Sequence, residues 1–116
     1  MIFHNYQKRV NNDQIPKLIM KNKEIELVED FNFLGIQIDK NLSWKKHIFN
    51  LSHKMSKAIG VMNRLKEFLP KKILKMIYNS LVNSHLNYGI LLWGHQSESI
   101  SKLQKKAIRI ISKASY

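Results

Sequence analysis

The feature that most constrains this chain is a change in the spacing of its apolar residues near residue 43. Before that point, short apolar runs alternate with turn-forming residues, which is typical of strands. After it, apolar residues recur about every 3.6 positions, as in amphipathic helices. The pattern predicts an α+β fold, with a small antiparallel sheet or hairpin over residues 1–40 and a three-helix bundle over residues 44–115.

The strand-like part contains three apolar runs, at residues 17–20, 24–28 and 31–38. In the second run, apolar residues alternate with glutamates, which suits a sheet with one solvent-facing side. Asn22-Lys23 is the predicted tip of a hairpin between the first two runs. The third run, FNFLGIQI, is expected to be a single strand interrupted by Gly35.

Three helices are expected in the second part. The first follows Ser43, a plausible N-cap; the second follows Pro70 and ends at Gly94; the third begins near Ser97 or Ser99. The end of the second helix, ILLW, is apolar nearly all round, so we expect it to be buried. The expected buried faces are Trp44, Ile48, Leu51, Met55, Ala58, Ile59, Met62 and Leu65; Ile73, Ile77, Leu81, Ser84, Tyr88 and Leu91; and Ile100, Leu103, Ala107, Ile110, Ile111 and Ala114.

The net charge of +12 is confined to the helical part of the chain. Residues 1–44 contain six basic and six acidic side chains, whereas residues 45–116 contain fourteen basic and two acidic ones. Such asymmetry favours a polyanionic partner, with nucleic acid first and an anionic membrane second. A lysine-rich surface that only confers solubility is the alternative.

Two predicted helices carry cationic rows opposite their apolar faces, and such rows suit contact with backbone phosphates. The large apolar residues of these helices are expected to have partners within the chain, which argues against a membrane surface. The rows comprise Lys46, His53, Lys57 and Arg64 on the first helix, and Lys102, Lys105, Lys106, Arg109 and Lys113 on the third.

No pattern of residues indicates catalysis. The chain has no cysteine, its five histidines lack metal-ligand spacing, and its eight carboxylates are not grouped as a two-metal site requires. There is no glycine-rich phosphate loop, no apolar run long enough to span a membrane and no signal-peptide core at the start. We therefore expect no metal or other cofactor in this chain, no membrane association, and an intracellular location, nuclear or cytoplasmic.

Three stretches together resemble the reverse transcriptases of non-LTR (LINE-type) retrotransposons, particularly jockey-like elements. They are FNFLGIQIDKNLSWKKHI at 31–48, LPKKILKMIYNSLVNSHLNYGILLWG at 69–94 and LQKKAIRII at 103–111. The resemblance implies that residues 1–42 are the end of the polymerase palm and residues 43–116 a thumb-like basic helical bundle. It also implies that Phe33, Leu34 and Gly35 form the primer grip, where a residue without Cβ lets a nucleic-acid backbone come close; a β-bulge is the structural alternative.

The nucleic-acid-binding residues expected on these grounds are Phe33, Leu34, Gly35, Lys45, Lys46, His53, Lys57, Arg64, Lys102, Lys105, Lys106, Arg109 and Lys113.

The resemblance also implies that this chain lacks the fingers and the paired aspartates that bind magnesium in the parent family. We therefore expect an inactive fragment of an RNA-directed DNA polymerase that retains primer–template binding. Its expected partners are an RNA–DNA or DNA duplex and the missing palm and fingers. The alternatives are a free-standing basic nucleic-acid-binding helical module and a structural protein-interaction domain.

Overall fold

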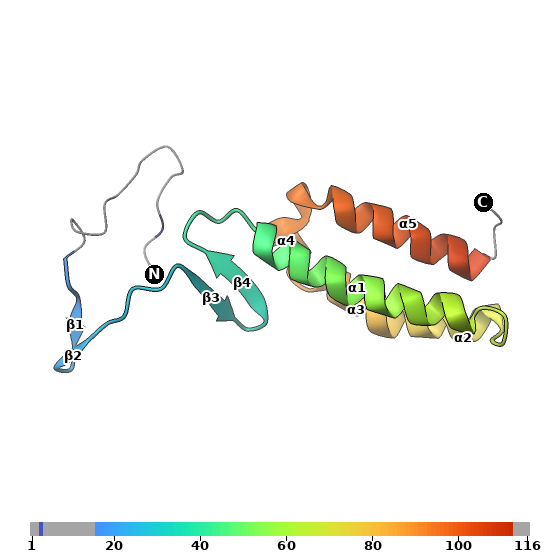
Figure 1. The fold of residues 1–116 in the computed structure, drawn as a ribbon, viewed down its shortest axis with the longest axis horizontal. Helices are drawn as coiled ribbons and strands as arrows, with labels where there is room; N and C mark the ends of the chain where they lie inside the picture. The colour runs from blue at the N-terminus through green and yellow to red at the C-terminus, as the bar shows by residue number, and fades with distance from the viewer. Residues whose placement is uncertain (1–2, 4–15, 113–116) are drawn as a thin grey trace. The chain divides into compact units, whose positions relative to one another are not determined.

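The computed structural model describes Phe3 and residues 16–112, which form two compact units divided between Lys46 and His47. Two antiparallel strand pairs are followed by several helices (Figure 1), so the expected α+β class is confirmed. The units are called the N-terminal unit and the helical unit below.

The first strand pair is a short hairpin in the N-terminal unit. Strand β1 (Ile19–Met20) pairs with β2 (Lys23–Glu24). Lys21 and Asn22 connect the strands with φ of 50° and 61°, the positive values that a tight two-residue hairpin turn requires. The predicted hairpin is therefore confirmed, with its tip one residue earlier than expected.

The second strand pair corrects the prediction of one strand over residues 31–38. Strand β3 (Asp30–Phe33) pairs with β4 (Ile36–Asp39), and Leu34 and Gly35 form the turn between them. Both turn residues have positive φ, 50° and 84°, so a residue without Cβ is favoured at the second position. The glycine serves a hairpin turn. The sequence predicts a single strand because apolar residues alternate with polar ones on both sides of the turn.

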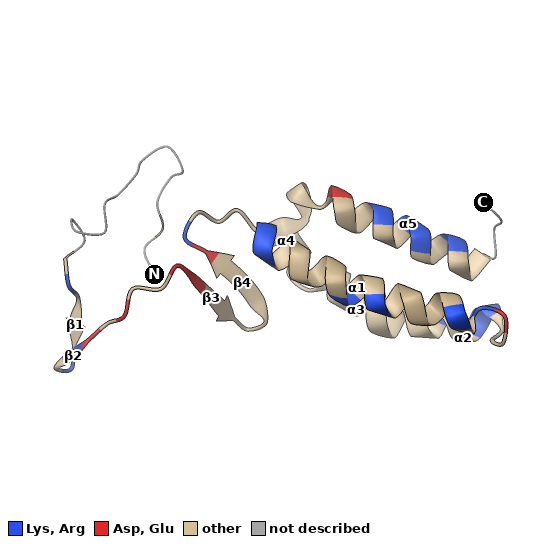
Figure 2. Cartoon of the chain, in the orientation of Figure 1, with Lys and Arg blue, Asp and Glu red and all other residues tan. Residues whose placement is uncertain are grey.

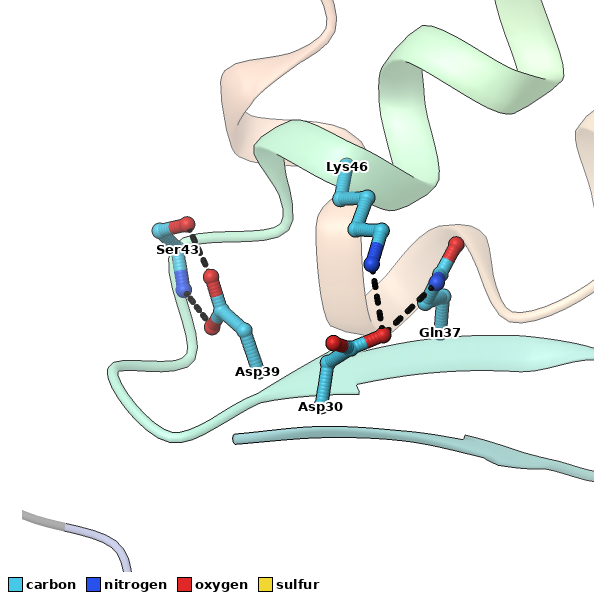
Figure 3. A network of polar contacts seen from close by, with 5 residues as sticks. All are labelled: Asp30, Gln37, Asp39, Ser43 and Lys46. Atoms are coloured by element: carbon cyan, nitrogen blue, oxygen red, sulfur yellow. Dashed lines mark hydrogen bonds and ion pairs between the residues drawn. The ribbon is translucent and has the colours of Figure 1, made fainter. Parts of the chain in front are cut away.

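The segment that follows β4 is fixed by the Asp39 carboxylate. It accepts a hydrogen bond from the backbone N–H of Ser43 at 2.7 Å and another from the Ser43 hydroxyl (Figure 3). Helix α1 (Lys45–Leu65) begins two residues later. Ser43 is therefore not at the predicted N-cap position, because Trp44 separates it from the first residue of α1. Trp44 is half-buried with φ of 58°, outside the helix.

Helix α1 buries the face that the sequence predicts. The buried apolar residues of α1 are Ile48, Leu51, Met55, Ile59 and Met62. They recur at three- and four-residue spacing, which places them on one side of the helix. The opposite side is exposed and contains the predicted cationic row.

The second predicted helix is wrong as a single element. It is divided at Tyr88 and Gly89, where Tyr88 is extended and Gly89 adopts the left-handed conformation with φ of 68°. This break ends one helical segment and starts another. The segments are α2 (Lys71–Tyr78), the π-helix η2 (Asn79–Asn83), α3 (Ser84–Asn87), α4 (Ile90–Trp93) and the 3-10 turn η3 (Gly94–Gln96).

The buried side of these segments also differs from the prediction. Leu74, Val82, Leu86 and Trp93 are buried, whereas the expected stripe is mainly exposed. Apolar residues occur at four-residue spacing on two adjacent faces, so the sequence does not determine which face enters the core. Most of ILLW is exposed as well, and Leu91 is 97% exposed.

Helix α5 (Glu98–Ser112) begins where it was expected and completes the core with Ile100, Ala107 and Ile110. It packs against α2, where the side-chain amide of Gln104 donates to the Tyr78 hydroxyl at 3.3 Å. Of the helices in the described part of the chain, none has both the length and the apolarity of a membrane-spanning segment.

Candidate nucleic-acid interface

The cationic side of α1 is the first candidate surface. His53, Lys57 and Arg64 are exposed and lie opposite the buried stripe. Lys46 lies in line with Arg64, five turns earlier, about 27 Å along the axis at 1.5 Å per residue. Phosphates along one DNA strand are about 3.4 Å apart in the axial direction, so a row of this length spans several of them.

Lys46 is not a free cation in this row. Its ammonium group donates to the Asp30 carboxylate at 2.7 Å, and the amide of Gln37 donates to the same carboxylate at 3.1 Å (Figure 3). These hydrogen bonds from Lys46 and then Gln37 lower the pKa of Asp30 below its usual value. Because Asp30 offsets its charge, Lys46 attracts a phosphate less strongly than an unpaired lysine would.

Helix α5 provides the second candidate surface, with Lys105, Lys106 and Arg109 exposed. Lys102 pairs with Glu98 at 2.8 Å, and the hydrogen bond from Lys102 lowers the pKa of Glu98 while raising that of Lys102. Lys113, the last predicted member of this row, lies outside the described residues.

Charges are distributed unevenly along the chain (Figure 2). Residues 47–116 contain twelve lysines and arginines but only Glu67 and Glu98 as carboxylates. Among the described residues, Lys57, Arg64 and the three α5 cations named above form no ion pair with a carboxylate. The exposed helix faces therefore carry positive charge that the described chain does not neutralise.

The three predicted primer-grip residues lie at the tip of the second hairpin. Phe33 is the last residue of β3, and Leu34 and Gly35 form the turn. The side chains of Phe33 and Leu34 are 56% and 74% exposed. The hairpin thus presents two apolar side chains to solvent in the N-terminal unit, together with Lys45, which is exposed at the start of α1.

The sequence prediction missed two residues on the cationic side of α1. Phe49 is 72% exposed and lies about 40° around the helix from His53, at 100° per residue. Gly60 is exposed between Lys57 and Arg64. A helical wheel places both residues on this side, but an apolar aromatic residue is ordinarily assigned to the core and a lone glycine to no role.

His47, by contrast, belongs to the core. Its ring lies 5.7 Å from the Trp93 ring, and the two planes are inclined at 54°. Burial lowers the pKa of His47, and the nearby positive charge of Lys54 lowers it further. Both effects favour the neutral imidazole, so His47 does not contribute a cation to the interface.

The described residues include no group of three or more His, Asp or Glu side chains placed to hold a metal ion. These surfaces offer cations, exposed apolar side chains and backbone groups for binding.

The chain is similar to an RNA-directed DNA polymerase from the mobile element jockey of Drosophila funebris. The two sequences are 29% identical over 108 residues, which cover 85% of this chain and 12% of that protein. No protein-family model matches the chain, and no solved structure matches it. The similarity supports a reverse-transcriptase-like origin, and the chain corresponds to a small part of that relative's length.

Proposed function

We propose that this chain is the primer–template-binding part of an RNA-directed DNA polymerase from a non-LTR retrotransposon. In this proposal the helical unit is the thumb, and its cations hold the phosphates of an RNA–DNA or DNA duplex. The observation that carries the proposal is the exposed, unneutralised positive charge of α1 and α5. The similarity to a mobile-element polymerase supports nucleic acid as the polyanion.

The tip of the second hairpin has a separate role in the proposal. Exposed Phe33 and Leu34 provide apolar contacts for the sugars at the primer 3′ end. Gly35, which has no Cβ, lets the nucleic-acid backbone come close to the turn. This is the primer grip that the sequence resemblance implies.

Nucleotide transfer is assigned to another part of the parent polymerase. In the proposal, paired aspartates and magnesium located outside this chain perform that step. This chain positions the duplex and contributes no group to the bond that forms.

The proposal is tested by measuring the affinity of the chain for a labelled RNA–DNA duplex by fluorescence anisotropy. The variant Lys57→Glu/Arg64→Glu reverses two free charges on α1 and is expected to weaken binding by at least ten-fold and to flatten the salt dependence. The control Lys21→Glu/Lys23→Glu makes the same change in net charge on the first hairpin. If both variants weaken binding equally, α1 is not the binding surface.

A second candidate function, a protein-interaction domain, is favoured by the exposed apolar residues of α4. The consecutive residues Ile90, Leu91 and Leu92 are 42%, 97% and 50% exposed. Contiguous exposed apolar side chains are typical of surfaces that bind proteins. If this surface binds a protein, the chain will elute from gel filtration of a nuclease-treated lysate together with a protein partner, and Leu91→Ser will release that partner. Elution of the chain as a monomer from the same lysate would contradict it.

A further inference from the structure

We infer that Gly60 is a point of close contact between α1 and the sugar–phosphate backbone of a bound duplex. The inference rests on the proposed nucleic-acid-binding function and adds to it a specific residue whose role is to let the ligand approach the helix.

Gly60 differs from the other three glycines because no feature of the described structure requires glycine at its position. Gly35 and Gly89 have positive φ, which side-chain-bearing residues rarely adopt. At Gly94 an added Cβ would lie 3.1 Å from the Ile90 side chain. At Gly60 an added Cβ would meet no atom within 4 Å.

Glycine at this position also disfavours the helix. Gly60 lies inside α1, sixteenth of its 21 residues, where glycine is among the least favourable residues because it loses the most backbone entropy. Alanine would fit there without a clash and would favour the helix. A glycine that neither packing nor backbone conformation explains is suited to a ligand that must approach the backbone closely.

The surroundings of Gly60 indicate what that ligand is. Lys57 and Arg64 lie three residues before and four residues after it, hence on the same side of the helix. His53 lies two turns earlier on this side, and all three side chains are exposed. The helix backbone at Gly60 therefore has a cation before it and a cation after it. A nucleic-acid strand that approaches Gly60 closely could place a phosphate against each of these cations.

The test compares Gly60→Ala with Asn63→Ala in the full chain. Both changes favour the helix, and Asn63 is exposed about 100° around the helix from Arg64, outside the cationic row. Each should raise the melting temperature, by about 2–6 °C for Gly60→Ala. Gly60→Ala should weaken affinity for the RNA–DNA duplex by about three- to ten-fold and Gly60→Leu by more, with the salt dependence retained because all the cations remain.

Asn63→Ala should bind the duplex as the wild type does. Unchanged affinity in Gly60→Ala and Gly60→Leu, with a higher melting temperature, would overturn the inference. If Lys57→Glu/Arg64→Glu still loses binding in that case, the proposed function stands without it. If that double variant also binds normally, the proposed function fails as well.

Discussion

Trp93 is a core residue of the helical unit and follows the helix break at Tyr88 and Gly89. Replacing it tests the packing of this core directly. Its side chain is fully buried, its indole N–H donates to the Tyr88 carbonyl at 3.2 Å, and its ring packs against His47. The carbonyl belongs to the residue at which α3 ends, where intrahelical hydrogen bonds are lost. Trp93 therefore both fills the core and satisfies the backbone at the break.

Two variants separate these contributions. Trp93→Ala removes the whole ring and should cost about 3–5 kcal/mol of unfolding free energy. Trp93→Phe keeps an aromatic ring in the core but removes the indole N–H that donates to the Tyr88 carbonyl, and the loss of that hydrogen bond should cost about 0.5–1.5 kcal/mol. Against a total of roughly 5–15 kcal/mol for a domain, the alanine variant is expected to be partly unfolded in the absence of denaturant when the total is at the low end.

The assay is urea unfolding followed by far-UV circular dichroism, which reports the helices and does not depend on tryptophan emission. The slope of the unfolding free energy against urea concentration should be unchanged in both variants, while the urea concentration at the midpoint of unfolding falls. Two outcomes would refute the reasoning. One is a cost below about 0.5 kcal/mol for Trp93→Ala, which would show that the ring is not in a packed core. The other is an equal cost for both variants, which would show that the volume lost on going to alanine contributes nothing.

Two further predictions concern charged groups. Burial lowers the pKa of His47 below its ordinary value of 6.5, so the unfolded chain binds the proton more readily. The contribution of His47 to stability should be constant above about pH 6.5 and should decrease as the pH falls below that value. In thermal melts between pH 5 and 7.5, His47→Gln should remove this decrease. An unchanged pH profile in that variant would contradict the assignment. Asp30→Asn frees Lys46 from its ion pair, so that Lys46 can hold one more phosphate. The logarithmic slope of duplex affinity against salt should therefore steepen by about one. Combining it with Lys46→Gln should abolish the gain, and a gain that persists would exclude Lys46 as its source.

The fold class was predictable because the change in apolar spacing near residue 43 reflects two different backbone geometries. The face of α1 that is buried was predictable for the same reason, since most of its apolar residues lie on one side and most of its polar residues on the other. The segment after Pro70 was not, because two adjacent faces are apolar and the packing partner decides between them. The π-helix and the left-handed Gly89 then interrupt the 3.6-residue period on which the prediction depended.

The candidate site, like the fold, was predictable from the sequence only in part. The cationic rows follow from helical periodicity, and they are exposed where the structure describes them. The pairing of Lys102 with Glu98 is a spacing of four on one helix and could have been read from the sequence. The pairing of Lys46 with Asp30 could not, because it joins residues sixteen positions apart and depends on how the second hairpin folds.

The salt dependence of duplex affinity tests the central proposal most directly. The five free cations named on α1 and α5 predict a logarithmic slope of about −4.5 if each holds one phosphate, and about −2 if only the two on α1 do. Lys57→Glu/Arg64→Glu should flatten the slope by about two, whereas Lys21→Glu/Lys23→Glu should leave it unchanged. A wild-type slope flatter than about −1, or no binding to the RNA–DNA duplex at low salt, would contradict nucleic-acid binding by this chain.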